Sequence, residues 1–257
     1  MNRDGFVKFF SLNGISVLFR NIKPHRDPRR EIRGRRTGHA LDGGNGFANR
    51  IVPGRIARAF LPLGIRDFDY RRYAGWKTAN VIEDVLLSAG LEPTTQLIAD
   101  LAAEKSRLAR EELRAANPVA PECIPVLTTL SRNYALALAS SGSQASIALF
   151  LTFNRCAHLF QSVLCGDDVT QAKPHPEIYQ RTFAKLDIDP CAALVIEDAV
   201  AGIQAARAAG AGAVVGVEGT CSVSQLSAAG ASRVIRGVSD LPRFLCDTYE
   251  NAVSTED

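Results

Sequence analysis

The chain has 257 residues, of which 46% are hydrophobic, and its formal net charge is +3. This length and apolar content favour a globular protein with one large domain, or with a core and a smaller inserted unit. No run of about 18 apolar residues is present, and the first residues lack the order of a secretory signal, so we expect a cytoplasmic protein without a membrane partner.

The first part of the chain, residues 1–39, is irregular and basic. It holds ten Lys and Arg against three acids, a net +7, which leaves −4 for the remainder. Residues 6–10 and 15–19 are strand-like, whereas residues 20–36 are rich in Arg and Pro and have no periodicity. Arginine-rich sequence without interleaved aromatic residues is typical of a solvated segment, so we expect no nucleic-acid partner.

The next segment, residues 68–116, has a helical pattern. Val81, Val85 and Leu86 follow helical spacing, and the charged residues 103–114 would form a solvated helix face. We predict an α-helical cap over residues 61–117, inserted into a core formed by residues 40–60 and 118–257.

From Tyr134 onward, short apolar runs alternate with helical patterns, which indicates βαβ units. The predicted helices 176–186 and 200–209 begin with Pro176 and end before Gly210, respectively. Continuously apolar strands are typical of a parallel sheet covered on both faces. We therefore predict an α/β fold with a doubly wound parallel sheet, whose strands include residues 134–140, 162–165, 193–196 and 213–217.

The cysteines are scattered and form neither a C-x-x-C pair nor a cluster with histidines. We interpret them as reduced, mostly structural thiols. They are Cys123, Cys156, Cys165, Cys191, Cys221 and Cys246.

Polar residues follow three of the predicted strands. Glu197 and Asp198 come directly after an apolar run, where two carboxylates could hold Mg²⁺, although an acid there also suits a helix cap. Lys173 lies in a polar loop before a helix, as a point charge for phosphate or as an ordinary surface lysine. Ser140 and Ser141 end a buried strand, as a phosphate cradle or as a simple helix cap.

Together these three motifs resemble those of the haloacid dehalogenase-like hydrolases over about residues 65–217. The motifs are the strand ending in Ser140, KPHPEIY with Lys173, and IEDAVAGIQAARAAG with Glu197 and Asp198. The motif sequences are most similar to those of the branch that holds phosphoglycolate phosphatases, sugar phosphatases and β-phosphoglucomutases. The resemblance implies a doubly wound core, a phosphoryl group bound by Ser140, Ser141 and Lys173, and Mg²⁺ held by Glu197 and Asp198.

The resemblance also implies a helical cap that closes over the substrate. In the cap segment, GWKTANVIEDVL matches a Gly-bearing loop that precedes a helix. Trp76 and Lys77 are therefore candidate substrate contacts. A core indole and a surface amine are the structural alternatives.

The family's first motif, D-x-D-G after an apolar strand, is altered in this chain. In the best-placed match, HALDGG, Asp42 takes the acid/base position and Ala40 stands where the nucleophile belongs. The alternative FSLNG places Ser11 and Asn13 at the two Asp positions. We expect the first strand to be badly formed or replaced by residues 6–12.

Several functional hypotheses follow from these motifs. The first is a Mg²⁺-dependent phosphatase, acting as a monomer on a small phosphomonoester, with Asp42 and Lys173 as catalytic residues. The second is a non-catalytic binder of phosphate esters, or an inert product of a damaged gene. We favour a shifted reading frame or wrong start over the first 35–55 residues as the cause of the altered motif. A β-phosphoglucomutase-like phosphomutase is the rival within the family.

Overall fold

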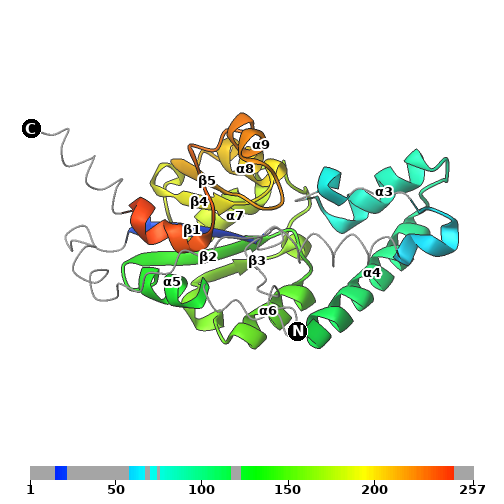
Figure 1. Cartoon of the computed structure of the whole chain (residues 1–257), viewed down its shortest axis with the longest axis horizontal. Helices are drawn as coiled ribbons and strands as arrows, with labels where there is room; N and C mark the ends of the chain where they lie inside the picture. Colours follow the sequence, from blue (N-terminus) through cyan, green and yellow to red (C-terminus); the bar gives the residue numbers. More distant parts are fainter. Residues whose placement is uncertain (1–14, 22–57, 67–69, 74–75, 117–122, 246–257) are drawn as a thin grey trace, which may run out of the picture.

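A central β-sheet with helices on both faces organises the fold (Figure 1). The computed structural model describes residues 15–21, 58–66, 70–73, 76–116 and 123–245. Within these residues the sheet has the strand order β3-β2-β1-β4-β5-β6. The strands are β1 Ile15–Asn21, β2 Tyr134–Ser140, β3 Ser162–Leu164, β4 Leu194–Glu197, β5 Ala213–Val217 and β6 Arg233–Ile235.

The helices cover the sheet in two layers. Helices α7, α8 and α9 pack on one face, and α5 and α6 pack on the other (Figure 1). The bounds are α3 Thr78–Ser88, α4 Thr95–Ala116, α5 Cys123–Leu130, α6 Gln144–Asn154, α7 Glu177–Leu186, α8 Val200–Ala208 and α9 Val223–Ala228. Short 3₁₀ helices lie at Leu61–Leu63, Tyr70–Tyr73, Ala157–Leu159, Gly166–Asp168, Pro190–Ala192 and Val238–Asp240.

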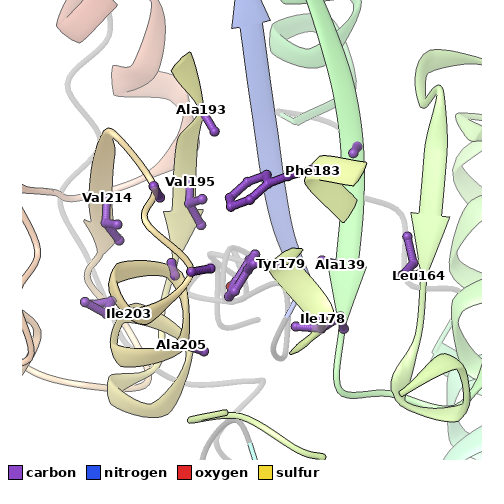
Figure 2. Packing of buried hydrophobic residues seen from close by; sticks show 14 of the residues in the cluster. Ala139, Leu164, Ile178, Tyr179, Phe183, Ala193, Val195, Ile203, Ala205 and Val214 are labelled. Carbon is purple, nitrogen blue, oxygen red and sulfur yellow. The ribbon is translucent and has the colours of Figure 1, made fainter. Parts of the chain in front are cut away.

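Alternate residues of the buried strands enter opposite cores, as the pleat requires. In β2, Ala137 and Ala139 face the α7–α8 layer, whereas Leu136 and Leu138 face the α5–α6 layer. Small strand side chains leave room for two large rings of α7. Figure 2 shows Tyr179 and Phe183 between Val195 of β4 and Ala139 of β2, and the centroids of the two rings lie 6.4 Å apart.

Strand β1 runs against its neighbours. It pairs antiparallel with β2 and with β4, whereas the pairs β2–β3, β4–β5 and β5–β6 are parallel. All the other strands therefore share one direction, and their carboxyl ends lie at one edge of the sheet. Ile15 at the start of β1 pairs with Ser140 at this edge, and Asn21 at its end pairs with Tyr134 at the opposite edge.

Helices α3 and α4 lie together to one side of the sheet (Figure 1). They share a small apolar core with the residues just before them, made of Ala59, Phe60, Tyr73, Val81, Ile82, Val85, Leu86 and Leu101. We call α3, α4 and this core the helical unit. It lies where the cap was predicted from residues 61–117, and α4 also packs against α6 of the sheet domain.

The predicted doubly wound α/β fold is confirmed, with one difference in the sheet. The strands predicted at residues 134–140, 162–165, 193–196 and 213–217 correspond to β2, β3, β4 and β5. The expectation that residues 6–12 replace the first strand is wrong, because Ile15–Asn21 occupies the place between β2 and β4. The difference in composition is the position of the charge: five uncharged residues, 15–19, open β1 before Arg20, whereas Lys8 lies in the middle of residues 6–10, and a central strand is covered on both faces. Residues 6–12 themselves lie outside the described residues.

Within the described part of the chain, no helix has the length and apolar character needed to cross a membrane. The cysteines found in that part, Cys123, Cys156, Cys165, Cys191 and Cys221, are free thiols.

Candidate active site

The carboxyl ends of β2 and β4 bring the predicted site residues to one edge of the sheet. Ser140 is the last residue of β2, and Glu197 is the last residue of β4. Both strands flank β1, so their ends lie two strands apart in the sheet. In open α/β sheets this edge is where ligands bind.

Lys173 and Glu197 form an ion pair inside the protein. The Lys173 Nζ lies 2.7 Å from the Glu197 Oε1, and each side chain is about 1% exposed or less. The Tyr179 hydroxyl donates to the same carboxylate oxygen at 3.1 Å, and the Tyr179 ring lies 4.9 Å from the Lys173 Nζ. A buried charge needs such partners, because water no longer solvates it. The ion pair therefore fixes the lysine at the carboxyl edge of the sheet.

The second oxygen of Glu197 is bound to the backbone of its own turn. The Glu197 Oε2 accepts hydrogen bonds from the N–H groups of Asp198 and Ala199, at 2.8 and 3.0 Å. Gly202 makes room for this carboxylate, because a Cβ atom at position 202 would overlap it. Both oxygens of Glu197 thus accept hydrogen bonds from protein donors, which hold Lys173 and the acidic turn together. The role of Glu197 as a magnesium ligand stays a prediction.

Asp198 offers the carboxylate that fits a magnesium ion. Asp198 is 4% exposed directly after β4, and its Oδ2 accepts a hydrogen bond from the Thr220 hydroxyl at 2.9 Å. Mg²⁺ in proteins is commonly bound through one or two carboxylates together with waters and substrate phosphate. The donor chemistry of Asp198 fits that pattern. Among the described residues, no group of three or more His, Cys, Asp or Glu side chains is placed to form a complete metal site.

The last residue of β2 carries a buried hydroxyl. The Ser140 Oγ accepts a hydrogen bond from the Gly142 N–H at 3.0 Å, which leaves the hydroxyl proton to be donated elsewhere. At the start of α6, the Gln144 N–H donates to the Asp167 carboxylate at 2.9 Å. One N–H of this helix terminus is therefore already occupied by an acid of the protein.

The loop between β3 and α7, which carries Lys173, is held by two carboxylates. Asp168 accepts from the Cys165 N–H at 2.7 Å, and Glu177 accepts from the N–H groups of Thr170 and Gln171. These backbone hydrogen bonds stabilise the charged forms, so they hold the pKa of Asp168 and of Glu177 below the ordinary carboxyl value. The loop is thus ordered before any ligand arrives.

Two buried thiols near the site have raised pKa values. Burial raises the pKa of Cys221, and the nearby charges of Asp198 and Glu197 raise it further. Burial, together with a hydrogen bond to Asp168, raises the pKa of Cys165 to about 11. Both cysteines lie within the apolar clusters of the core.

The helical unit reaches the sheet domain through Lys77. The Lys77 Nζ donates a hydrogen bond to the Val169 carbonyl oxygen at 3.1 Å, although the two residues are 92 positions apart. A pocket lies at this junction. Residues of both parts line it: Lys77, Ser141, Gly166, Val169, Ala172, Lys173 and Ile178.

The predicted site residues are thus only partly brought together. Ser141, Lys173 and Lys77 line one pocket, and Glu197 contacts Lys173 directly. Trp76 is 38% exposed and packs edge-on against the Tyr73 ring at 5.6 Å, and it does not line this pocket. Asp42, with Ala40, Ser11 and Asn13, lies outside the described residues.

Other residues of the site were missed at the level of the sequence. Tyr179 ends the KPHPEIY motif and Gly202 lies within the acidic motif, so the motifs themselves contained a signal for both. No sequence signal pointed to Thr220, because its contact with Asp198 depends on how the loop after β5 folds back toward the end of β4.

A buried lysine, a serine loop and an acidic turn thus lie together at the carboxyl edge of an α/β sheet. The sequence pattern of the family described as "Haloacid dehalogenase-like hydrolase" matches residues 66–216, which is more than half of the chain. The chain belongs to this family.

Individual relatives match over shorter stretches. Protein CbbY of Rhodobacter capsulatus is 38% identical over 78 residues, 29% of this chain and 34% of CbbY. Fructose-1-phosphate phosphatase YqaB of Escherichia coli is 30% identical over 139 residues, 54% of this chain and 70% of YqaB. The chain thus spans about a third of CbbY and a larger share of YqaB.

The fold is similar to that of solved structures. A β-phosphoglucomutase from Clostridium difficile superimposes with a TM-score of 0.69 at 22% identity, covering 83% of this chain and 96% of that one. At this identity the likeness establishes the shared fold.

Proposed function

We propose that this protein is a Mg²⁺-dependent phosphatase that acts, as a monomer, on a small phosphomonoester of the sugar-phosphate or phosphoglycolate type. The observation that carries the proposal is the pocket where Lys173 and Ser141 of the sheet domain face Lys77 of the helical unit. Two lysines and a serine loop suit an anionic ligand. The relative YqaB, a fructose-1-phosphate phosphatase, supports the choice of a sugar phosphate.

Each site residue has a separate role in the proposed reaction. Lys173 and the serines at positions 140 and 141 bind the phosphoryl group, and Glu197 holds Lys173 in place. Asp198 would hold Mg²⁺, which when bound neutralises charge on the phosphoryl oxygens. Asp42 is the proposed acid/base that protonates the leaving oxygen.

The role of the helical unit is to cover the ester. Lys77 would contact the bound anion, and Trp76, the residue before it, would contact the rest of the substrate. Closing this unit over the pocket excludes water from the reacting group. The hydrogen bond from Lys77 to the Val169 carbonyl supports this placement.

The test is release of inorganic phosphate from fructose 1-phosphate and phosphoglycolate, with and without Mg²⁺. Asp198→Asn and Asp42→Asn should each abolish release. Asp100→Asn makes the same change on an exposed face of α4, where Asp100 accepts a hydrogen bond from Gln96, and should leave release unchanged. Equal activity in Asp198→Asn, Asp42→Asn and the unaltered chain would refute the proposal.

A second candidate function is non-catalytic binding of phosphate esters. The antiparallel direction of β1 supports it, because Asn21 at the end of β1 lies at the edge opposite to Ser140. A carboxylate placed directly after this strand would therefore lie at the edge opposite to Ser140, away from the predicted site residues. Calorimetry with Mg²⁺ and fructose 1-phosphate that detects binding without phosphate release would favour this candidate over the phosphatase.

Two further outcomes separate the remaining hypotheses. Conversion of β-glucose 1-phosphate to glucose 6-phosphate would identify a phosphomutase. A gene sequence that encodes D-x-D-G in another frame upstream of residue 60 would support the shifted reading frame, and its absence from every frame would end that idea.

A further inference from the structure

We propose that Thr220 is a positioning residue, which orients the carboxylate of Asp198 for the metal ion. This inference rests on the proposed function, since it assigns Asp198 as the magnesium ligand. Its basis is the hydrogen bond of 2.9 Å from the Thr220 hydroxyl to the Asp198 Oδ2. A ligating carboxylate held by such an outer partner keeps one rotamer, so its metal affinity does not have to overcome side-chain freedom.

The contrast with Glu197 shows why this contact matters. The two acids are adjacent in sequence, and both are buried. Glu197 is fixed by the cationic Lys173 and by two backbone N–H groups. The hydrogen bond from Thr220 orients Asp198 through a neutral hydroxyl, which adds no positive charge beside the carboxylate. A donor of this kind can hold a ligating carboxylate without competing electrostatically with a cation.

The backbone around Thr220 is anchored on both sides. Before it, the Glu218 N–H donates to the Ile235 carbonyl oxygen of β6 at 2.9 Å. After it, Ser222 caps α9: its hydroxyl accepts from the Gln225 N–H at 3.3 Å, and its N–H donates to the Gln225 side chain at 2.9 Å. These anchors on either side of position 220 fix where the hydroxyl lies.

Thr220 also follows the segment that matches the family pattern. The family pattern matches residues 66–216, and position 220 follows its end. The role of Thr220 therefore comes from the folded chain, where the loop after β5 returns to the end of β4. Strands β4 and β5 are paired in parallel, which places these two ends side by side.

The experiment is a titration of the full-length protein with Mn²⁺ alone, followed by electron paramagnetic resonance of the free ion, with Mg²⁺ calorimetry beside it. Thr220→Val keeps the shape and removes the hydroxyl, and we expect it to raise the metal dissociation constant about tenfold, the usual effect of losing an outer-shell partner. Thr220→Ser keeps a hydroxyl and should restore most of the affinity. Thr128→Val is the matched control, since the Thr128 hydroxyl donates to the Ile124 carbonyl oxygen within α5, away from the site.

The outcomes separate this inference from the proposed function. Equal dissociation constants for Thr220→Val and the unaltered chain would overturn the inference alone. Metal binding that is absent from the unaltered chain would overturn the assignment of Asp198, and with it both proposals. A Thr220→Val protein that melts at the temperature of the unaltered chain, but binds Mn²⁺ tenfold more weakly, would support a positioning role rather than a general structural one.

Discussion

The two walls of the pocket are built in different ways. On the sheet side, Lys173 is nearly fully buried and is held by Glu197 and by the ring of Tyr179. On the side of the helical unit, Lys77 is half-buried and donates a hydrogen bond across the junction, to the Val169 carbonyl. Both walls present an ammonium group to the same pocket.

This difference assigns a different physical role to each lysine. A charge that is buried with its partner is already in place before a ligand binds, so little reorganisation is needed. A charge held by an exchangeable hydrogen bond can leave the Val169 carbonyl and turn to an anion. We therefore expect changes on the sheet side to affect folding strongly, and changes at Lys77 to affect ligand binding alone.

The largest expected effect comes from breaking the ion pair on one side. Glu197→Ala leaves the Lys173 ammonium buried without its carboxylate, which should cost about 3–5 kcal/mol of unfolding free energy. Urea unfolding measures it. The double variant Glu197→Ala with Lys173→Met removes both charges and should recover much of that loss, because no uncompensated charge remains. Additive losses in the double variant would show that the pair is not coupled.

A smaller effect is expected when the space beside the Glu197 carboxylate is filled. Gly202→Ala places a methyl group against the Glu197 carboxylate, so the side chain must shift, and overpacking of this kind costs about 1–3 kcal/mol. Urea unfolding again gives the value. Shortening the acid with Glu197→Asp tests the cause: if the overlap is responsible, Gly202→Ala should cost less when combined with Glu197→Asp than it does alone. An equal cost in both backgrounds would point to a different origin.

Changing the other wall should leave stability nearly intact. Lys77→Met removes a charge and the bond to the Val169 carbonyl, so we expect fructose 1-phosphate to bind roughly 2- to 10-fold more weakly, as for the loss of about 0.5–1.5 kcal/mol. Calorimetry measures the dissociation constant. Lys105→Met is the matched control, since the Lys105 ammonium bonds to the Thr78 hydroxyl within the same helical unit. Equal weakening in both variants would mean that the helical unit, rather than Lys77, is responsible.

The sequence predicted the sheet-side wall of the pocket better than the junction with the helical unit. Strand β2 and the two motifs around Lys173 and Glu197 are local patterns, in which apolar runs and turn residues lie next to the polar site residues in the sequence. The bond between Lys77 and Val169 joins residues far apart in the chain, and no local pattern encodes it. The different hydrogen-bond partners of Glu197 and Asp198 were also beyond the sequence, because they depend on which donors each carboxylate meets in the folded chain.

The direction of β1 could not be predicted from the sequence either. Residues 15–19 are apolar enough for a central strand, and this composition could be read from the sequence. Whether the strand runs with or against β2 depends on the connections that lead into and out of it. Apolar composition is the same in both directions, so it does not specify which end of β1 meets Ser140.

The smallest expected effect concerns the pH dependence of the loop that carries Lys173. The hydrogen bond from the Cys165 N–H lowers the pKa of Asp168 below its unfolded value of about 3.9. Its ionised form therefore adds stability that is fully present above about pH 4 and is lost as the pH falls through the lower, folded pKa. The gap in unfolding free energy between the unaltered chain and Asp168→Asn should be constant from about pH 7 to 5 and should shrink below about pH 4. Because Asp168 is exposed, we expect the change to be small. Urea unfolding across this pH range measures it, and a gap that stays constant down to about pH 3 would show that the sheet-side wall does not depend on this carboxylate's charge.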